Sequence, residues 1–514
     1  MNSLFHYLKK SAEQSPDKEA IVHGDVRLTY GEIFKLACSI AAFLHEKGLK
    51  KGGRVSLLLD NSPEYVATYY GVLAAGGVVV GLNTATKARD LTNWITHSGS
   101  SWLVAHSKHP ELNKILTEHS DLSCLLVGEQ DELAETELLF RWQDAIATDT
   151  TEPDISTLGS NNQLAAIIYT SGTTGNPKGV TLSHQNLVCN TESIISYLGL
   201  VESDRVMNVL PFYYSYGNSV LHTHLAVGAT VVLENSLLYP QKVLKKMQDE
   251  RVTGFSGVPS TFSLLLSRAN FKDYQLSSLR YITQAGGAMA PSNINRILND
   301  LPDNKFFVMY GQTEATARLS YLPPERLKEK LGSIGIAIPG VSLEIRNEDG
   351  IKVSVGETGQ ICAKGPNIMQ GYWNDPETTA RTINDGWLMT GDLATYDDEG
   401  FIYITGRASE MIKSGANRIS PKEIEEVISE LEDVEEVAVV GIPDETLGEV
   451  IKAFIVISPG QKLEKMAIQA HCRNNLALYK IPKFIEFVSE LPKTASGKVK
   501  RYMLIENHDV KTVA

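Results

Sequence analysis

The sequence has no cluster of lysine and arginine, and its formal net charge is −13 at pH 7 over 514 residues. Nucleic-acid binding depends on grouped positive charge, so this balance argues against a nucleic-acid partner. The five cysteines, at positions 38, 124, 189, 362 and 472, are far apart and include no CxxC pair. This spacing gives no sign of a disulfide framework or a zinc site and is typical of free thiols in a reducing compartment.

Segments that could enter a membrane are also scarce. The N-terminus lacks the apolar core of a secretory signal. The stretch Tyr65–Leu82 is uncharged for 18 residues, which is close to the length of a membrane span. However, Gly76 and Gly77 would weaken a spanning helix, so we predict a buried helix that begins at Pro63, followed by the strand Val78–Val80. We therefore expect no membrane span and a cytoplasmic protein.

The first part of the chain contains alternating helix and strand patterns. Thr29 and Glu32 have capping-box spacing, and apolar residues then recur at helical intervals up to Gly48. Further predicted elements are the strand Val55–Leu59, a helical stretch near 87–97 and the strands Trp102–Ala105 and Ala165–Tyr169. Residues 130–162 are polar and acidic and are interpreted as a surface connection. This order predicts an α/β fold with mostly parallel sheets covered by helices.

The pattern changes near residue 400. Ser420, Pro421 and Glu423 form a second capping-box pattern before an amphipathic helix. The strands Val437–Val440 and Phe454–Ile457 complete a predicted α+β unit of about 105 residues, a typical size for one domain. We place the boundary at 405–410, which gives a large N-terminal domain, residues 1–406, and a small C-terminal domain, residues 407–514.

The most informative segment is YTSGTTGNPKG, Tyr169 to Gly179, directly after an apolar strand. Its hydroxyls, its glycines and Lys178 can donate many hydrogen bonds to phosphate oxygens, and glycine lets the backbone approach closely. The P-loop pattern GxxxxGK[ST] is an alternative. From Gly172 it would require Gly at 177 and Ser or Thr at 179, whereas the chain has Pro177 and Gly179. The segment therefore predicts phosphate binding outside the P-loop fold.

This loop resembles the signature of the adenylate-forming superfamily, which includes acyl-CoA synthetases, firefly-type luciferases and peptide-synthetase adenylation domains. Further motifs occur in the order of that family: YGQTE at 310–314, TGD at 390–392, GRASEMIKSGANRISPKEIE at 406–425 and PKTASGK at 492–498. The resemblance covers nearly the whole chain. It implies an enzyme that uses ATP and Mg²⁺ to join a small carboxylic acid to AMP and then transfers the acyl group to a thiol.

The resemblance implies roles for individual residues at the nucleotide. The β- and γ-phosphates would be held by Thr170, Ser171, Gly172, Thr173, Thr174, Gly175 and Lys178. Tyr310 would stack on adenine, Thr313 would bond the α-phosphate, and Asp392 would accept from both ribose hydroxyls. Further nucleotide contacts would come from Gly286, Gly287, Ala288, Gly311, Gln312 and Arg407.

Catalysis must bring two anions together, so positive charge is needed at the reacting atoms. By resemblance, Glu314 would hold Mg²⁺, and Lys498 would bridge the carboxylate and the α-phosphate, with Thr170 also placed among the catalytic residues. The small C-terminal domain is expected to be mobile. It would rotate about Ser409, where relatives commonly have Asp or Lys, and bring the turn from Lys413 to Ala416, with Gly415, near the thiol channel.

The acyl pocket is predicted around PFYYSYG, residues 211–217. The family often has His at the position of Tyr214, where the side chain gates the acyl pocket and the thiol tunnel. The remaining lining is predicted to come from Phe255, Ser256, Gly257, Gly287 and Gly311. These groups are neutral and modest in size, which favours an uncharged acyl tail over a dicarboxylate.

Four further residues in this region are interpreted as packing residues. Tyr213 and Tyr216 are expected to belong to an aromatic cluster. His222 and His224 have HxH spacing, but positions two apart on a helix do not face the same way. We therefore expect two ordinary helix histidines rather than a metal site.

The leading hypothesis is an acyl-CoA ligase. A stand-alone enzyme that loads an acyl or aminoacyl group onto the phosphopantetheine of a carrier protein, acting in trans, uses the same chemistry, and the motifs do not separate the two. Luciferase-like oxygenation stays open on the same fold. An inactive binding or scaffolding relative is the hypothesis from another class, and the presence of Lys178, Glu314, Asp392, Arg407 and Lys498 argues against it.

Overall fold

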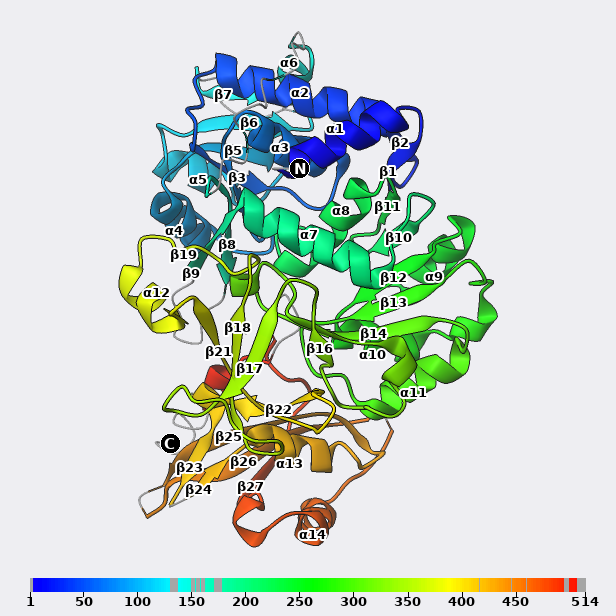
Figure 1. The fold of residues 1–514 in the computed structure, drawn as a ribbon, viewed down its shortest axis with the longest axis vertical. Helices are drawn as coiled ribbons and strands as arrows, with labels where there is room; N and C mark the ends of the chain where they lie inside the picture. The colour runs from blue at the N-terminus through cyan, green and yellow to red at the C-terminus, as the bar shows by residue number, and fades with distance from the viewer. Residues whose placement is uncertain are drawn as a thin grey trace.

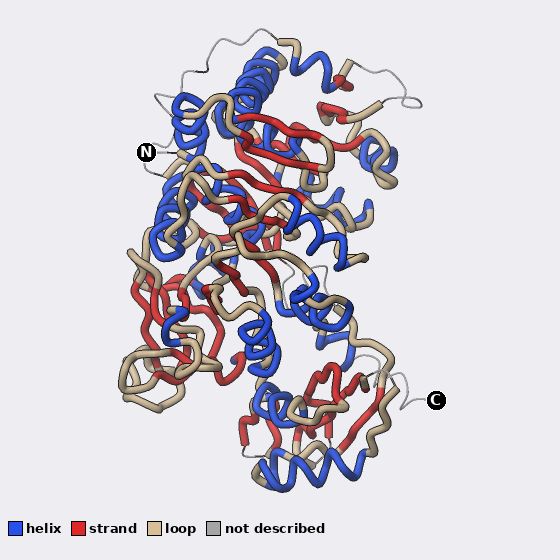
Figure 2. Tube along the Cα trace, turned by 90° about the vertical axis from the view of Figure 1, so that its right-hand side faces the viewer, coloured by secondary structure: helices blue, strands red, loops and turns tan. Residues whose placement is uncertain are grey.

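The computed structural model describes residues 3–129, 137–148, 153, 158, 162–170, 178–415, 417–444, 446–458, 460–493 and 499–505. Two large sheets and a third, smaller one form a large N-terminal part, and a fourth sheet belongs to a smaller C-terminal part (Figure 1). The C-terminal part lies at one end of the molecule, as the turned view in Figure 2 also shows. Within the described ranges we find no helix with the length and apolar character that crossing a membrane requires.

The first large sheet has eight strands in the order β19-β9-β8-β4-β3-β5-β6-β7. They are β3 (Arg54–Leu58), β4 (Val78–Gly81), β5 (Ser100–His106), β6 (Ser123–Val127), β7 (Leu139–Arg141), β8 (Leu164–Thr170), β9 (Lys178–Ser183) and β19 (Gly371–Tyr372). The strands from β8 to β7 pair in parallel, whereas β9 and β19 add antiparallel. One face packs on α4 (Ala88–Ser98) and α5 (Leu112–Glu118). The other packs on α1 (Leu4–Gln14), α2 (Tyr30–Glu46), α3 (Pro63–Ala74) and α6 (Trp142–Ile146).

The second large sheet has nine strands in the order β16-β15-β14-β13-β12-β10-β11-β1-β2. They are β1 (Glu19–His23), β2 (Val26–Thr29), β10 (Arg205–Asn208), β11 (Thr230–Leu233), β12 (Gly254–Gly257), β13 (Tyr281–Gln284), β14 (Lys305–Tyr310), β15 (Ser320–Leu322) and β16 (Ile336–Ala337). Its outer face packs on α9 (Pro240–Asp249), α10 (Pro259–Arg268) and α11 (Pro291–Asp300). Helices α7 (His184–Leu198) and α8 (Ser215–Ala226) share one core with both large sheets.

The third sheet leads towards the C-terminal part. It contains β17 (Ser342–Arg346), β18 (Gly359–Lys364), β20 (Ile383–Asn384), β21 (Trp387–Tyr396) and β22 (Ile402–Arg407), with α12 (Pro376–Thr382) preceding β20. The fourth sheet contains β23 (Ile412–Ser414), β24 (Asn417–Ile419), β25 (Val434–Asp444), β26 (Gly448–Ile457) and β27 (Phe484–Phe487). Helices α13 (Pro421–Ile428) and α14 (Lys465–Asn475) cover one of its faces. The third sheet ends at Arg407 and the fourth begins at Ile412, and the division at 406/407 stays a prediction.

The helix starts show how local sequence sets the elements. Thr29 and Glu32 form the predicted capping box: the Glu32 N–H donates to Thr29 Oγ1 at 3.2 Å, and the Thr29 N–H donates to Glu32 Oε2 at 2.8 Å. Such a cap contributes about 1 kcal/mol to helix stability. The uncharged stretch after Pro63 is a buried helix followed by β4, as predicted. The α/β architecture with mostly parallel sheets is confirmed.

Two local predictions are wrong. Ser420 makes no capping bond to α13; its hydroxyl donates to the carbonyl oxygen of Thr405, and Glu423 instead pairs with Lys480 at 2.6 Å. Tertiary contacts thus replace the predicted capping box. The bond from Ser420 to Thr405 connects the start of α13 with β22. The segment 130–162 is more than a surface connection, because its described residues include β7 and α6, with Trp142 buried.

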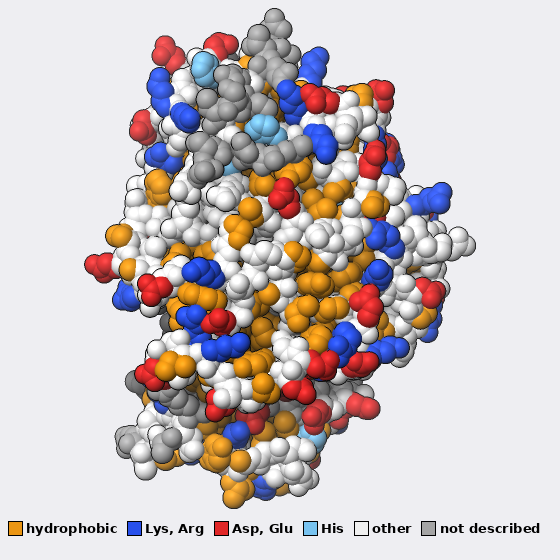
Figure 3. All heavy atoms as spheres, viewed as in Figure 1, with side chains coloured by type: hydrophobic (Ala, Val, Ile, Leu, Met, Phe, Trp, Pro, Cys, Tyr) orange, Lys and Arg blue, Asp and Glu red, His pale blue; other side chains and the backbone are white. Residues whose placement is uncertain are grey.

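Figure 3 shows how charged and hydrophobic side chains are distributed on one face of the molecule. Basic and acidic side chains are intermingled on this face, and hydrophobic side chains gather near its middle, over the region of α7 and β17 in Figure 1.

Candidate active site

The predicted phosphate loop joins two paired strands. Thr170 ends β8 and lies opposite Lys178, which begins β9, in antiparallel register. The ammonium nitrogen of Lys178 lies 4.9 Å from the ring centroid of Tyr372 in β19. The loop residues Ser171, Gly172, Thr173, Thr174 and Gly175 lie outside the described residues. Both ends of the loop are therefore fixed by the first large sheet.

The YGQTE motif forms a tight turn after β14. A Cβ atom on Gly311 would lie 2.1 Å from the carbonyl oxygen of Ala317, so only glycine lets the chain fold back this closely. Gln312 then precedes a short 3₁₀ helix, Thr313–Ala315, and β15 returns antiparallel to β14. Tyr310 therefore stands at the end of β14, beside the turn that carries Thr313.

Asp392 joins two other predicted nucleotide residues. It lies in β21 opposite Arg407 in β22. Its Oδ1 accepts from Arg407 Nε at 2.8 Å, and its Oδ2 accepts from the hydroxyl of Tyr310 at 2.6 Å. Burial and the neighbouring carboxylate raise the pKa of Tyr310, so its hydroxyl stays protonated and donates at neutral pH. Residues far apart in the sequence thus form one hydrogen-bonded group.

A second group surrounds Glu314. Its Oε1 accepts from the hydroxyl of Tyr372 at 2.8 Å, and burial together with Glu314 raises the pKa of this tyrosine. Because Lys178 lies over the same ring, Tyr372 connects the end of the phosphate loop with the predicted metal ligand. On the other side of the turn, Thr313 Oγ1 lies 3.2 Å from Ser215 Oγ at the start of α8.

The AGGAMA segment follows β13 at the same sheet. Gly286, Gly287 and Ala288 are exposed there, and the φ of 89° at Gly286 favours glycine. The side-chain amide of Gln284 donates to the carbonyl oxygen of Gly287 at 2.7 Å. Since β12, β13 and β14 are parallel, this loop and the YGQTE turn emerge from the same edge, where α/β proteins commonly bind ligands.

The structure places some of the predicted acyl-pocket residues near one another, but not all of them. Tyr214 precedes α8 and is half-buried; its hydroxyl accepts from the Asn83 amide at 3.3 Å, and burial raises its pKa to about 12. Ser256 Oγ accepts from Thr283 Oγ1 at 2.8 Å on the inner side of the second sheet. Gly257 ends β12, where an added Cβ would lie 3.0 Å from Phe262.

Phe255 requires a correction. Its side chain is fully buried and packs edge-on against Phe262, with ring centroids 5.7 Å apart. Successive side chains of a strand point to opposite faces, so Phe255 faces the outer helices while Ser256 faces the other way. Its ring therefore belongs to the outer core and not to the predicted pocket.

The packing predictions for Tyr213, His222 and His224 are confirmed, whereas Tyr216 packs against the guanidinium of Arg318 and has no aromatic ring contact among the described residues. Tyr213 and Tyr216 are buried, and so are His222 and His224. His222 Nδ1 lies 3.0 Å from the hydroxyl of Tyr70, and His224 Nε2 lies 2.6 Å from the hydroxyl of Tyr281. Burial lowers the pKa of His222 to about 3 and that of His224 to about 4, so both are neutral packing residues.

The hinge prediction falls on a short 3₁₀ helix between two sheets. Ser409 is exposed in this helix, and its neighbour Glu410 pairs with Arg501, Oε2 to Nη1, at 3.2 Å. Lys498, three residues before Arg501, lies outside the described residues. Arg501 therefore contacts Glu410, which lies next to the predicted hinge residue and three positions after Arg407.

The predicted thiol-channel residues lie in and beside β23. Lys413 is exposed, and its N–H donates to Glu449 Oε2 at 2.6 Å. Gly415 has a φ of 59°, and its N–H donates to the carbonyl oxygen of Leu447 at 2.8 Å. Lys413 therefore belongs to the C-terminal sheet, and Gly415 begins the exposed turn that follows β23.

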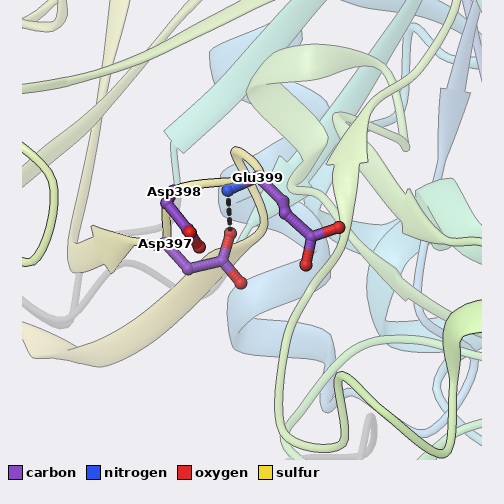
Figure 4. A group of neighbouring side chains, drawn as sticks. All are labelled: Asp397, Asp398 and Glu399. Carbon is purple, nitrogen blue, oxygen red and sulfur yellow. Dashed lines mark hydrogen bonds between the residues drawn. The ribbon is translucent and has the colours of Figure 1, made fainter.

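An acidic turn is the only place in the described chain where three possible metal ligands converge: Asp397, Asp398 and Glu399, shown in Figure 4. Asp397 Oδ1 accepts from the N–H of Glu399 at 3.0 Å. Lys330 lies 2.8 Å from Asp397 Oδ2, and Arg326 lies 2.8 Å from Glu399 Oε2. Lys330 and Arg326 thus pair with two of the three carboxylates, which makes the turn between β21 and β22 a salt-bridged structural feature.

Comparisons with known proteins match this arrangement. Residues 8–373 match the family described as AMP-binding enzyme, and residues 423–498 match the AMP-binding enzyme C-terminal domain. A long-chain-fatty-acid–CoA ligase of Bacillus subtilis (strain 168) is 34% identical, over 99% of this chain and 96% of that protein. A feruloyl-CoA synthase of Amycolatopsis is also 34% identical, over 95% and 96%. The solved MenE o-succinylbenzoate CoA synthetase of Bacillus subtilis, with ATP and magnesium, has a TM-score of 0.85 and 29% identity, over 97% and 98% of the chains.

The chain belongs to the AMP-binding enzyme family, whose relatives here are named CoA ligases and synthetases. It is therefore an enzyme of the AMP-forming acid–thiol ligase class, with the large N-terminal and smaller C-terminal domains of that family. The roles of its individual site residues stay predictions.

Proposed function

We propose that the protein activates a small carboxylic acid with ATP, releasing pyrophosphate, and then transfers the acyl group to the thiol of CoA. The observation that carries this proposal is the convergence of Tyr310, Asp392 and Arg407. Tyr310 begins the turn that holds Glu314, and Arg407 precedes the predicted hinge residue Ser409, whose neighbour Glu410 pairs with Arg501. Family membership supports the same reaction class.

In the first step a carboxylate oxygen attacks the α-phosphorus, the bond to the pyrophosphate oxygen breaks, and an acyl-adenylate forms. Both reactants carry negative charge, so fixed cations and donors lower the barrier most where charge builds up. Lys178 would act at the leaving phosphates, Thr313 at the α-phosphate and Lys498 between the two reacting groups. Asp392 would orient the ribose while holding Tyr310 beside the base.

A magnesium ion fits Glu314. Tyr372 holds Oε1 of this carboxylate, while Oε2 has no hydrogen-bond partner among the described residues and can serve as a ligand. Mg²⁺ is commonly bound by one or two carboxylates together with phosphate oxygens. When bound, the ion would neutralise charge on the phosphates.

Replacing Tyr372 with phenylalanine is expected to weaken this metal site without changing the fold. The variant removes only the hydroxyl that orients Glu314, and loss of such a supporting bond lowers metal affinity by about tenfold or more. The measurement is the Mg²⁺ concentration that gives half-maximal pyrophosphate release. Tyr396→Phe is the matched control, because its hydroxyl donates to the backbone of Val353. An equal shift in both variants would contradict the role of Tyr372.

In the second step the thiol attacks the acyl carbon, the acyl–oxygen bond breaks, and AMP leaves with that oxygen. This step would follow a rotation about Ser409 that brings the Gly415 turn to the site. CoA is favoured as the acceptor because the relatives are named CoA ligases and synthetases. A carrier protein acting in trans is the second candidate.

The test is product analysis with ATP, MgCl₂ and a panel of carboxylic acids, with either CoA or a phosphopantetheine-bearing carrier protein added. We expect AMP and an acyl-CoA in equal amounts. A thioester that forms only on the carrier protein would refute CoA as the acceptor. Formation of ADP in place of AMP would refute the proposed reaction.

A further inference from the structure

Arg318 is a buried cation that pairs with no carboxylate among the described residues. Its side chain is 3% exposed, and none of the ion pairs among the described residues includes it. Its Nε donates to Met309 Sδ at 3.4 Å and its Nη1 to the carbonyl oxygen of Ala317 at 3.2 Å. The guanidinium carbon lies 4.1 Å from the ring centroid of Tyr216. Its surroundings are a sulfur, a single carbonyl, an aromatic face and the hydroxyl of Tyr197, which donates to the same sulfur at 3.0 Å and interacts with the guanidinium.

Such an environment is an unfavourable place for a positive charge. A guanidinium has five N–H donors, and the bonds to Met309 and Ala317 use two of them. A buried charge is costly unless an opposite charge or several strong acceptors accompany it. A methionine or leucine would fill a similar volume without that cost, so packing alone does not explain an arginine here.

The position of Arg318 connects it with the predicted acyl pocket. A Cβ atom on Gly311 would lie 2.8 Å from the Arg318 Cα. The hydroxyl of Tyr216, whose ring lies beneath the guanidinium, bonds Thr283 Oγ1 at 2.9 Å, and Thr283 in turn bonds Ser256. Ser215, the residue before Tyr216, lies 3.2 Å from Thr313, which is predicted to bond the α-phosphate. Tyr216 and Arg318 therefore lie close to the predicted reaction site.

We propose that Arg318 determines substrate specificity by receiving an anionic or strongly hydrogen-bond-accepting group at the tail of the acyl substrate. The inference rests on the proposed function, because it concerns the acid that is activated. A carboxylate pairs with two guanidinium N–H groups at once and is the acceptor that suits this site best. The neutral lining residues favour an uncharged tail, whereas this guanidinium favours a tail that carries an acceptor.

The test compares acids of equal length that differ only at the tail: hexanoate, 6-hydroxyhexanoate and hexanedioate, and 3-phenylpropanoate against its para-carboxylate. Acid-dependent ATP–pyrophosphate exchange is measured for the wild type, Arg318→Met and Arg318→Lys. A hydrogen bond to a charged group predicts that kcat/KM favours the acceptor-bearing acid by about 10- to 100-fold in the wild type. Arg318→Met should abolish this preference, and Arg318→Lys should keep part of it.

Two outcomes would overturn the inference while leaving the proposed function intact: a wild type that uses the methyl-ended acids equally well or better, or an Arg318→Met variant that loses the same factor with every acid. Thermal midpoint and ATP affinity of each variant show whether the fold is retained. If Arg318→Met does not fold, the inference is judged by the wild type alone: its kcat/KM must favour the acceptor-bearing acid within each matched set. Failure of every acid to support exchange would refute the proposed function itself.

Discussion

Replacing Lys498 with alanine is expected to reduce acyl-adenylate formation by about 10²- to 10³-fold, the usual effect of removing one group that stabilises charge in a transition state. The lysine would meet the carboxylate and the α-phosphate, two anions that repel each other. Thioester formation from chemically prepared acyl-AMP should stay close to the wild-type rate, because that step would follow removal of the lysine from the site. ATP–pyrophosphate exchange and single-turnover thiolation measure the two steps separately.

Lys500→Ala is the matched control, because Lys500 lies two positions further on and its backbone N–H donates to the carbonyl oxygen of Pro492 at 2.7 Å. This variant should retain both half-reactions. An equal loss of adenylation and thiolation in Lys498→Ala would contradict the role given to Lys498.

Replacing Asp392 with alanine is expected to lower kcat/KM for ATP by about 10- to 100-fold, the range for loss of a hydrogen bond to a charged group. Asp392 would accept from the ribose, and it also holds Tyr310 and Arg407 at 2.6 and 2.8 Å. Its removal therefore disturbs the base, ribose and hinge contacts together. Steady-state kinetics with ATP as the varied substrate measure the effect.

Asp392→Asn should fall between the wild type and alanine, because the amide keeps one acceptor oxygen but loses the charge. Asp398→Ala provides the control, since Asp398 is exposed on the turn that follows β21. Unchanged use of ATP by Asp392→Ala would refute the ribose assignment.

Local sequence signals predicted much of the fold. The capping box at Thr29, the helix start at Pro63 and the strand at Val78 depend on neighbours within a few positions, and each occurs in the structure. The second predicted capping box failed because its Ser420 found a partner, Thr405, 15 positions earlier in β22. Tertiary contacts of this kind leave no local pattern.

The site was only partly predictable for the same reason. The motifs identified Asp392, but its bonds to Tyr310 and Arg407 depend on strand register and on the packing of two sheets. Tyr372 was missed because it lies 58 positions from Glu314. Arg318 follows the YGQTE motif closely, yet only the packed structure shows that its charge has no carboxylate partner among the described residues.

The most direct test of the central claim uses an acid labelled with ¹⁸O in its carboxylate, together with ATP, MgCl₂ and CoA. Attack of the carboxylate on the α-phosphorus predicts one ¹⁸O atom in the phosphate of the released AMP and none in pyrophosphate. Label in inorganic phosphate together with ADP, or unlabelled AMP alongside acyl-CoA, would contradict it.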